Sequence, residues 1–172
     1  MRGASYAPRV ASPPSVLYVE LVMSVDRIGE AARAADVVAG EWPPAVVVAH
    51  VGDVDEQVWL PRIEQMVAAH DSGAPAPSFV WWEPDADATY DRYRAMSVDD
   101  ALAHSMSARI SVLTRLRELT PEQWGARGQH EIFGDMDIEA VIYAVLAHDE
   151  EHRASLLLPR RSDDVDGDAG PP

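Results

Sequence analysis

The chain has 172 residues, of which 47% are hydrophobic and 25% are charged, a balance typical of one soluble globular domain. Its formal net charge is -15 and all 14 basic residues are arginine, which disfavours binding to nucleic acid or to an anionic membrane. Cysteine is absent, which excludes disulfides, thiolate metal ligands and a nucleophilic cysteine, and fits a cytoplasmic protein. No stretch approaches the roughly 20 apolar residues of a membrane span.

The two ends of the chain differ in composition from its middle. Residues 1–14 contain three prolines and few large hydrophobic residues, and residues 159–172 are rich in Asp, Gly and Pro. Such segments bury too little apolar surface to offset the entropy of ordering, so both are predicted to be disordered arms. The folded domain is expected at residues 15–158.

Four segments of this domain have the apolar periodicity or the start signals of helices. They are residues 15–38, 43–69, 97–119 and 138–158. Helices of about 20 residues are about 30 Å long, and rods of this length bury their apolar stripes against one another. The sequence therefore predicts an all-α four-helix bundle with a long crossover connection, residues 71–96, between its second and third helices.

Three histidines occupy inward faces of this predicted bundle. On a wheel of 100° per residue, His152 lies about 40° from His148, and Val145 lies about 60° from it. The two imidazoles are therefore one turn apart on the apolar stripe of the fourth helix. His50 lies on the apolar arc of the second helix, with Val54 about 40° away. Metal sites in bundles are built from such facing positions.

A lone histidine in a core is more often a hydrogen-bonded structural residue than a metal ligand. The pair His148 and His152 weighs against this interpretation, because two neutral imidazoles side by side leave polar atoms that need partners. With His50, three neutral nitrogen ligands suit Zn²⁺ or Ni²⁺ and leave a coordination position open, as in catalytic sites. The metalloprotease pattern His-Glu-x-x-His does not fit, because Asp149 follows the first histidine.

The sequence resembles the DinB-like helical bundles, a family named for a DNA-damage-inducible gene, over residues 42–158. The resemblance rests on the histidine triad and its spacing, with support from the segment before the fourth helix. The matching motifs are Val48-Ala-His50, Arg109, Trp124-x-x-x-Gly128-x-His130-x-x-x-Gly134-x-Met136 and His148-Asp149-x-x-His152.

This resemblance implies a four-helix bundle of up-down-down-up order and a divalent metal, often nickel or zinc, held by His50, His148 and His152. It also implies a homodimer in many members. The activities of relatives include transfer of low-molecular-weight thiols and a mycothiol-dependent isomerisation, and many members have no known reaction. Fold likeness alone does not choose among these.

Arg109 lies on the apolar stripe of the expected third helix, with Leu113 about 40° away on the wheel. An arginine in this position is costly unless its guanidinium is paired or reaches solvent. Two interpretations follow. Arg109 forms a structural ion pair with Asp53, Glu56 or Asp149, or it is a catalytic-site residue that anchors a carboxylate of the substrate or cosubstrate.

His130 lies between Gly128 and Gly134, just before the fourth helix. It is a candidate catalytic residue that reaches the open face of the metal as an acid, a base or a substrate contact. A loop-capping role is equally compatible with its position. Asp149 is a candidate to orient a ligand imidazole from behind.

Three hypotheses for function follow from these residues. The first is a metal-dependent transferase that uses a low-molecular-weight thiol of the bacillithiol or mycothiol type, because a chain without cysteine must take its sulfur nucleophile from a cosubstrate. The second is a hydrolase that acts on a small-molecule substrate through a metal-activated water. The third is a non-enzymatic metal-binding protein of the stress response.

Overall fold

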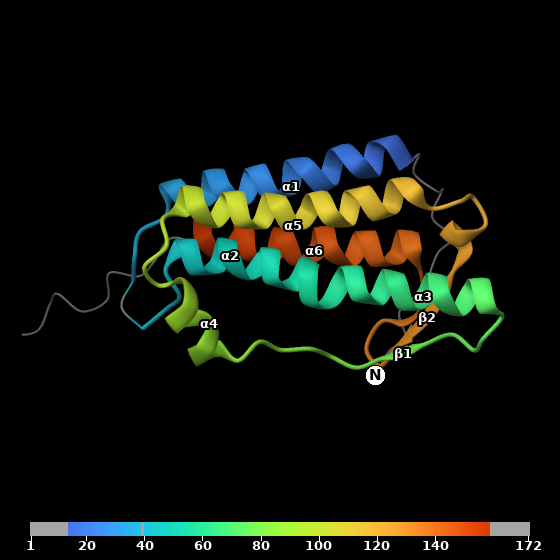
Figure 1. The fold of residues 1–172 in the computed structure, drawn as a ribbon. Coiled ribbons are helices and arrows are strands. Elements are labelled where there is room, and N and C mark those ends of the chain that lie inside the picture. The colour runs from blue at the N-terminus through green and yellow to red at the C-terminus, as the bar shows by residue number, and fades with distance from the viewer. Residues whose placement is uncertain (1–13, 39, 159–172) are drawn as a thin grey trace, which may run out of the picture.

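The computed structural model of the chain describes residues 14–38 and 40–158 (Figure 1). The predicted disordered arms at 1–14 and 159–172 lie outside the described residues, except for Pro14, which opens the first helix. Within the described residues, no helix is both long and apolar enough to cross a membrane.

Four long helical rods pack side by side in the described part of the chain, which confirms the mostly helical fold (Figure 1). They are α1 (Pro14–Ala34), the continuous rod of α2 (Pro44–Val54), η1 (Asp55–Trp59) and α3 (Leu60–Ser72), then α5 (Val98–Glu118) and α6 (Ile138–Leu157). In Figure 1, α1 and α6 run toward one end of the bundle, and the α2–α3 rod and α5 run toward the other.

Local sequence signals account for most of the helix ends. Pro44 occupies the first turn of α2, where its missing N–H has no intrahelical partner to lose. The side chains of Ser97 and Asp137 accept hydrogen bonds from the backbone N–H groups of Asp100 and Ala140, and so cap α5 and α6. Gly73, at a φ of 67°, ends α3 in the left-handed conformation that favours glycine.

The η1 segment interrupts the second rod with a turn of π-helix. The backbone N–H of Leu60 donates to the carbonyl of Asp55, five residues earlier, instead of four as in an α-helix. The sequence predicts one unbroken helix at 43–69, and the rod is indeed continuous. The extra residue in this turn nevertheless rotates everything after Asp55 relative to an ideal α-helical wheel.

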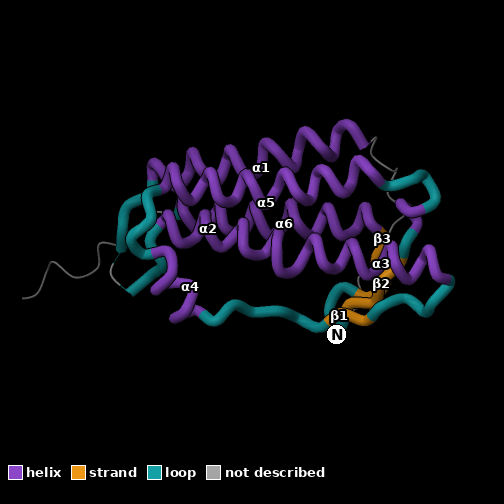
Figure 2. Tube along the Cα trace, in the orientation of Figure 1, coloured by secondary structure: helices purple, strands orange, loops and turns teal. Residues whose placement is uncertain are grey.

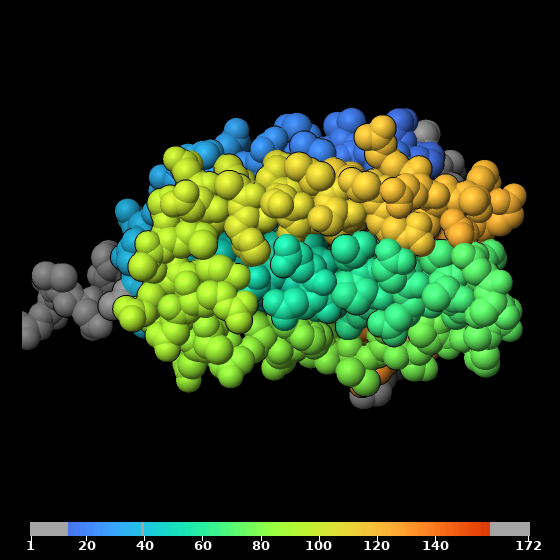
Figure 3. Space-filling view, viewed as in Figure 1, coloured from blue at the N-terminus to red at the C-terminus, as the bar shows by residue number. Residues whose placement is uncertain are grey.

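Two expectations about helix extent are wrong. The first helix ends at Ala34 and not at residue 38, because the chain must reverse direction before Pro44. The connection at 71–96 is also more ordered than predicted. It contains the helix α4 (Ala86–Tyr93), which the Asp85 side chain caps by accepting from the N–H of Ala88. In the space-filling view this segment runs back along the lower edge of the bundle (Figure 3).

The fold also departs from the predicted all-α class through a small sheet (Figure 2). Strands β1 (Ser78–Phe79), β2 (Arg127–His130) and β3 (Gly134–Asp137) pair in that order, β1 parallel and β3 antiparallel to β2. Strands of two to four residues are too short to give the alternating pattern by which strands are recognised. The sheet ties the connection after α3 to the segment before α6.

A polar layer separates two apolar clusters along the bundle. One cluster contains Leu17, Leu21, Val112 and Val145 among others, and the second contains residues such as Ile28. The buried polar side chains between the clusters come from all four rods, and they include Ser24, His50, Asp55, Arg109 and Asp149. The candidate site is built in this layer.

We expect Gly52→Ala to destabilise the protein by about 1–3 kcal/mol, because α2 and α5 approach closely at this residue. A Cβ atom on Gly52 would lie 2.9 Å from the Cα atom of Ser105, closer than the two backbones tolerate. Urea denaturation measures the loss. Gly125→Ala is the matched control, since its Cβ would meet no atom within 4 Å, and an equal loss in both variants would contradict the close-approach explanation.

Candidate metal centre

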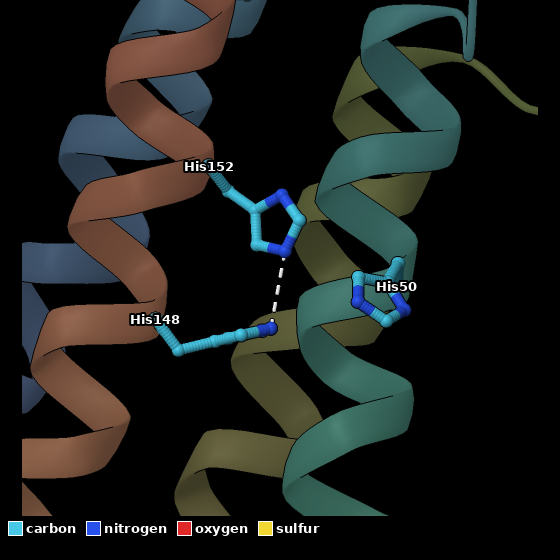
Figure 4. A group of neighbouring side chains, drawn as sticks. All are labelled: His50, His148 and His152. Atoms are coloured by element: carbon cyan, nitrogen blue, oxygen red, sulfur yellow. Dashed lines mark hydrogen bonds between the residues drawn. The ribbon is translucent and has the colours of Figure 1, made fainter. Parts of the chain in front are cut away.

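The structure brings His50 of α2 together with His148 and His152 of α6 (Figure 4). One nitrogen of each ring lies within 4.8 Å of the corresponding nitrogens of the other two. The Nε2 atoms of His148 and His152 are 3.1 Å apart. Two nitrogens bound at 2.0–2.1 Å to one tetrahedral ion lie about 3.3 Å apart, so this pair already has the spacing of shared ligands.

Burial keeps two of these imidazoles neutral. His50 is only 5% exposed, and burial, together with the proximity of His152 and His148, lowers the pKa of His50 to about 3. Burial and the neighbouring His148 lower the pKa of His152 to about 4. A neutral imidazole is the form that binds a metal, so proton competition at these two residues is weak at neutral pH.

An unsatisfied polar atom further indicates that the site is built for a cation. The Nδ1 atom of His50 is buried and has no hydrogen-bond partner among the described residues. Buried polar atoms without partners are rare in folded proteins. A divalent ion bound by the three rings would give His50 the partner that the protein itself does not supply, so the three residues fit a metal.

Tryptophan rings surround the histidines. The His50 ring lies edge-on to Trp42, with ring centroids 5.3 Å apart, and is stacked on Trp82 at 6.3 Å. The ring of His148 meets Trp59 at 6.4 Å. These indoles limit water access to the triad, and a less hydrated surrounding strengthens electrostatic interactions inside it.

Two cavities meet at His148. The first, of about 190 Å³, is lined by the three histidines together with Trp82, Arg62 and other residues. The second, of about 480 Å³, runs along α6 and is called the α6 groove below. Five residues line both spaces, namely Trp59, Trp81, Phe133, His148 and Glu151. The metal compartment therefore opens into a larger space on its α6 side.

Arg109 is fully buried and makes a network that reaches every rod of the bundle. Its guanidinium donates to the carboxylates of Asp55 at 2.7 and 3.4 Å and of Asp149 at 2.9 Å. It also donates to the Leu21 carbonyl at 2.8 Å and to the Ser24 hydroxyl at 3.0 Å. These contacts use all five N–H donors of a guanidinium.

Of the two interpretations of Arg109, this placement favours the structural ion pair over the substrate anchor. Asp149 is one of the three partners expected from the sequence, but Asp53 and Glu56 are not partners. Asp53 instead accepts from Tyr93 at 2.6 Å, and Glu56 is exposed. Asp55, the second partner, was missed because the sequence does not show which of the neighbouring carboxylates at residues 53–56 faces Arg109.

Asp149 links this network to the metal ligands. Its Oδ2 atom accepts from Ser24 at 2.6 Å and from Arg109, while its Oδ1 atom lies 3.8 Å from Nδ1 of His148. Burial acts to raise the pKa of Asp149, but the neighbouring His148, Arg109 and Ser24 hold it below the usual value. A movement of about 1 Å would bring the Oδ1 and Nδ1 atoms into hydrogen-bonding distance, the arrangement in which a carboxylate orients a ligand imidazole.

His130 lies in β2 and is buried, and its placement matches the loop-capping alternative. Its Nδ1 atom accepts from the backbone N–H groups of Ile132 at 3.1 Å and Phe133 at 3.3 Å. Its ring stacks on Phe133, with centroids 4.5 Å apart. His130 thus positions Phe133, which lines both cavities, and does not itself line either of them.

Sequence reasoning missed Trp59 and Arg62, which line the metal compartment. The guanidinium of Arg62 lies 5.4 Å from the ring centroids of Trp59 and Phe79 and donates to the carbonyl of Val80 at 2.7 Å. Both residues follow the start of the π-helical turn, so a regular wheel misplaces them. The sequence did contain one signal for them, because tryptophan and arginine are both enriched at binding sites.

We expect Arg109→Met to destabilise the protein by about 3–5 kcal/mol, because it leaves two buried carboxylates without their cation. Arg109→Lys should recover little of this, since an ammonium cannot satisfy both carboxylates with the geometry of a guanidinium. Chemical denaturation measures both losses. Arg33→Met, which removes an exposed pair with Asp99, serves as control and should cost less than about 1 kcal/mol.

The pKa shifts of His50 and His152 make the stability of the metal-free protein depend on pH. Unfolding returns both groups to an ordinary pKa of about 6.5, so the unfolded chain binds more protons below that pH. The free energy of unfolding in the presence of EDTA should therefore fall from pH 6.5 to pH 4, by on the order of 3 kcal/mol, because protonation of Asp55, whose pKa is raised to about 6, offsets part of the histidine effect. His50→Gln should flatten this slope and exposed His70→Gln should not; equal slopes in all three proteins would refute the explanation.

The fold and the site can be compared with known proteins. A model of the DinB superfamily matches residues 17–156. YfiT from Bacillus subtilis, described as a probable metal-dependent hydrolase with an unusual four-helix bundle topology, has a similar structure, with a TM-score of 0.66 and 16% sequence identity. The alignment covers 90% of this chain and 91% of YfiT.

A mutant of the mycothiol-dependent maleylpyruvate isomerase is also similar, with a TM-score of 0.57 and 10% identity. It aligns over 84% of this chain but only 61% of its own length. Likenesses at these identities concern the fold. No curated protein sequence matches the chain significantly. The superfamily match spans nearly the whole bundle, from α1 to α6, and the chain therefore belongs to the DinB superfamily.

Proposed function

We propose that this protein is a metal-dependent transferase that uses a low-molecular-weight thiol as cosubstrate. The observation that carries the proposal is the meeting of two cavities at His148. A hydrolase needs room for one organic substrate and a water, whereas a transferase needs room for two organic molecules. The paired spaces beside the triad suit the second case.

In this proposal His50, His148 and His152 hold a divalent ion, Zn²⁺ or Ni²⁺. When bound, the ion supplies an open coordination position and lowers the pKa of a thiol there, so that the thiolate is the nucleophile. Burial holds His50 and His152 in their neutral, ligating form. Asp149 orients the His148 ring, and Arg109 acts on the site as a positioning residue through Asp149.

The chain itself supplies binding and proton transfer. Because it contains no cysteine, the sulfur must come from a cosubstrate. Arg62 is the cation in the lining of the metal compartment, and it suits the carboxylate of a thiol cosubstrate. Glu151 lines both cavities and is placed to receive the thiol proton. His130 contributes by holding Phe133 against the two spaces.

A hydrolase that uses a metal-activated water is the second candidate, and the description of YfiT as a probable metal-dependent hydrolase favours it. Glu151 would then act as general base toward the water. A non-enzymatic metal-binding protein of the stress response is the third. The open cavities beside the triad support an enzyme over this last function.

The proposal extends to assembly and location. We propose a cytoplasmic homodimer, with the helices in up-down-down-up order. The helix directions in Figure 1 support this order. Val16, Val19 and Met23 support the dimer, since they leave an exposed apolar stripe along one face of α1.

The test is to load the protein with Co²⁺ and titrate bacillithiol, mycothiol and glutathione in turn. A transferase should show a thiolate-to-cobalt absorption band with one of the three thiols. The zinc-loaded protein should conjugate that thiol to 1-chloro-2,4-dinitrobenzene. His148→Ala should abolish both signals, and His70→Ala should preserve both because its side chain is exposed.

Absence of the band with all three thiols would eliminate the transferase. Hydrolysis of activated esters that is lost in His148→Ala would then support the hydrolase. Metal binding that raises only the melting temperature, without either reaction, would support the non-enzymatic function.

A further inference from the structure

The metal compartment is too small to hold an organic substrate by itself. Its volume is about 190 Å³, whereas sites for small organic molecules usually measure roughly 300–1,000 Å³. The α6 groove, at about 480 Å³, lies within that range. A molecule that reacts at the triad must therefore extend into a second space, and the groove adjoins the triad at His148 and Glu151.

The floor of the α6 groove is apolar because α6 carries small residues there. Ala140, Ala144 and Ala147 line it at spacings of four and three residues, which places them on one face of the helix. Larger side chains at these positions would fill the space. The groove exists because this face of α6 has methyl groups where the core-facing side has valine and isoleucine.

Aromatic and sulfur-containing side chains form the walls. Trp59, Trp81, Phe133 and Tyr143 line the groove together with Met136. The rings of Trp81 and Phe133 meet at a centroid distance of 6.2 Å where the two cavities join. Planar rings and polarizable sulfur pack well against a flat aromatic ligand.

The charged side chains that line the groove disfavour anions. Among the described residues that line it, the charged ones are Asp135 and Glu151, apart from the site histidine His148. Asp135 is engaged by Arg127 in a salt bridge, and Glu151 lies at the junction with the metal compartment. The cation Arg62 lines only the other cavity. Away from the triad, an anionic group would meet carboxylates in the groove and no counter-charge from its lining.

Trp59 carries a hydrogen-bond donor that the described part of the protein leaves unpaired. The residue is only 6% exposed and lines both cavities, and its indole Nε1 has no hydrogen-bond partner within the described residues. An N–H group left unpaired in a buried position gains free energy when a ligand brings an acceptor. The indole N–H is a donor only, so the matching ligand atom is an oxygen or nitrogen acceptor.

We propose that the α6 groove binds the electrophilic substrate, and that this substrate is an uncharged aromatic compound with a hydrogen-bond acceptor such as a carbonyl beside its ring system. The catalytic part of this inference rests on the proposed function, because it assigns the groove to the electrophile and the open coordination position of the metal to the sulfur of the thiol. The evidence for the binding site itself is the cavity, the side chains that line it and the unpaired indole N–H of Trp59.

The test measures binding separately from catalysis. The zinc-loaded protein is titrated calorimetrically with 2-acetylnaphthalene, with 2-ethylnaphthalene, which lacks the acceptor, and with 2-naphthoate, which is anionic. We expect 2-acetylnaphthalene to bind about tenfold more tightly than either of the others.

Ala144→Leu should weaken the binding of 2-acetylnaphthalene about tenfold or more by filling the groove. Trp59→Phe should remove the preference over 2-ethylnaphthalene and retain the weaker binding of the ring.

Ala154→Leu is the matched control, since Ala154 lies exposed on the same helix and lines neither cavity. It should bind 2-acetylnaphthalene like the unchanged protein, and Co²⁺ spectra should show the same metal site in all variants. Unchanged binding in Ala144→Leu, or tighter binding of 2-naphthoate, would overturn the groove assignment. If 2-acetylnaphthalene binds as expected but no thiol is conjugated, the groove assignment is retained and the transferase function is rejected. If a thiol is conjugated at the same rate in Ala144→Leu as in the unchanged protein, the transferase function is retained and the groove assignment is rejected.

Discussion

The guanidinium of Arg109 holds the four rods of this protein in one arrangement. Its donors reach Leu21 and Ser24 on α1, Asp55 in η1 and Asp149 on α6, while the residue itself belongs to α5. Burying a cation costs several kcal/mol, and only complete hydrogen bonding offsets that cost. The network therefore permits few alternatives in the relative height of the helices. Asp149 directly follows His148 in α6, so the hydrogen bonds of Arg109 also fix the position of the metal ligands on that helix.

The network also has an excess of negative charge on the side of the triad. Two carboxylates face one guanidinium, and burial raises the pKa of Asp55 to about 6 even though Arg109 pulls it downward. A cation held by the three histidines would stand next to Asp149 and reduce that imbalance. Structure and site are thus coupled through charge, and the polar layer between the two apolar clusters has a functional reason.

The sequence was sufficient to predict the helices and the triad, because both follow from a period of 3.6 residues. His50, His148 and His152 need only that period to face inward. The strands and α4 were missed because two to four residues give no alternation and because the prolines of residues 75–84 suggest an irregular segment. Asp55 was missed for another reason. Asp53, Asp55 and Glu56 lie within four consecutive positions, and the sequence does not show which of these carboxylates faces Arg109.

The extra residue in η1 divides the second rod into two parts. Side chains in the second part point in other directions than the numbering of a regular α-helix would predict. His50 precedes η1, whereas Trp59 and Arg62 follow its start. Metal ligation therefore depends on the first part of the rod, and the wall that a ligand meets depends on the second. Loss of one residue from this turn would restore a regular helix and leave the second part in its present orientation, because the π-helical turn is what accommodates the extra residue. Such a change in length would therefore act on the turn that contains Asp55, a partner of Arg109, while the metal ligands and the cavity wall stayed in place.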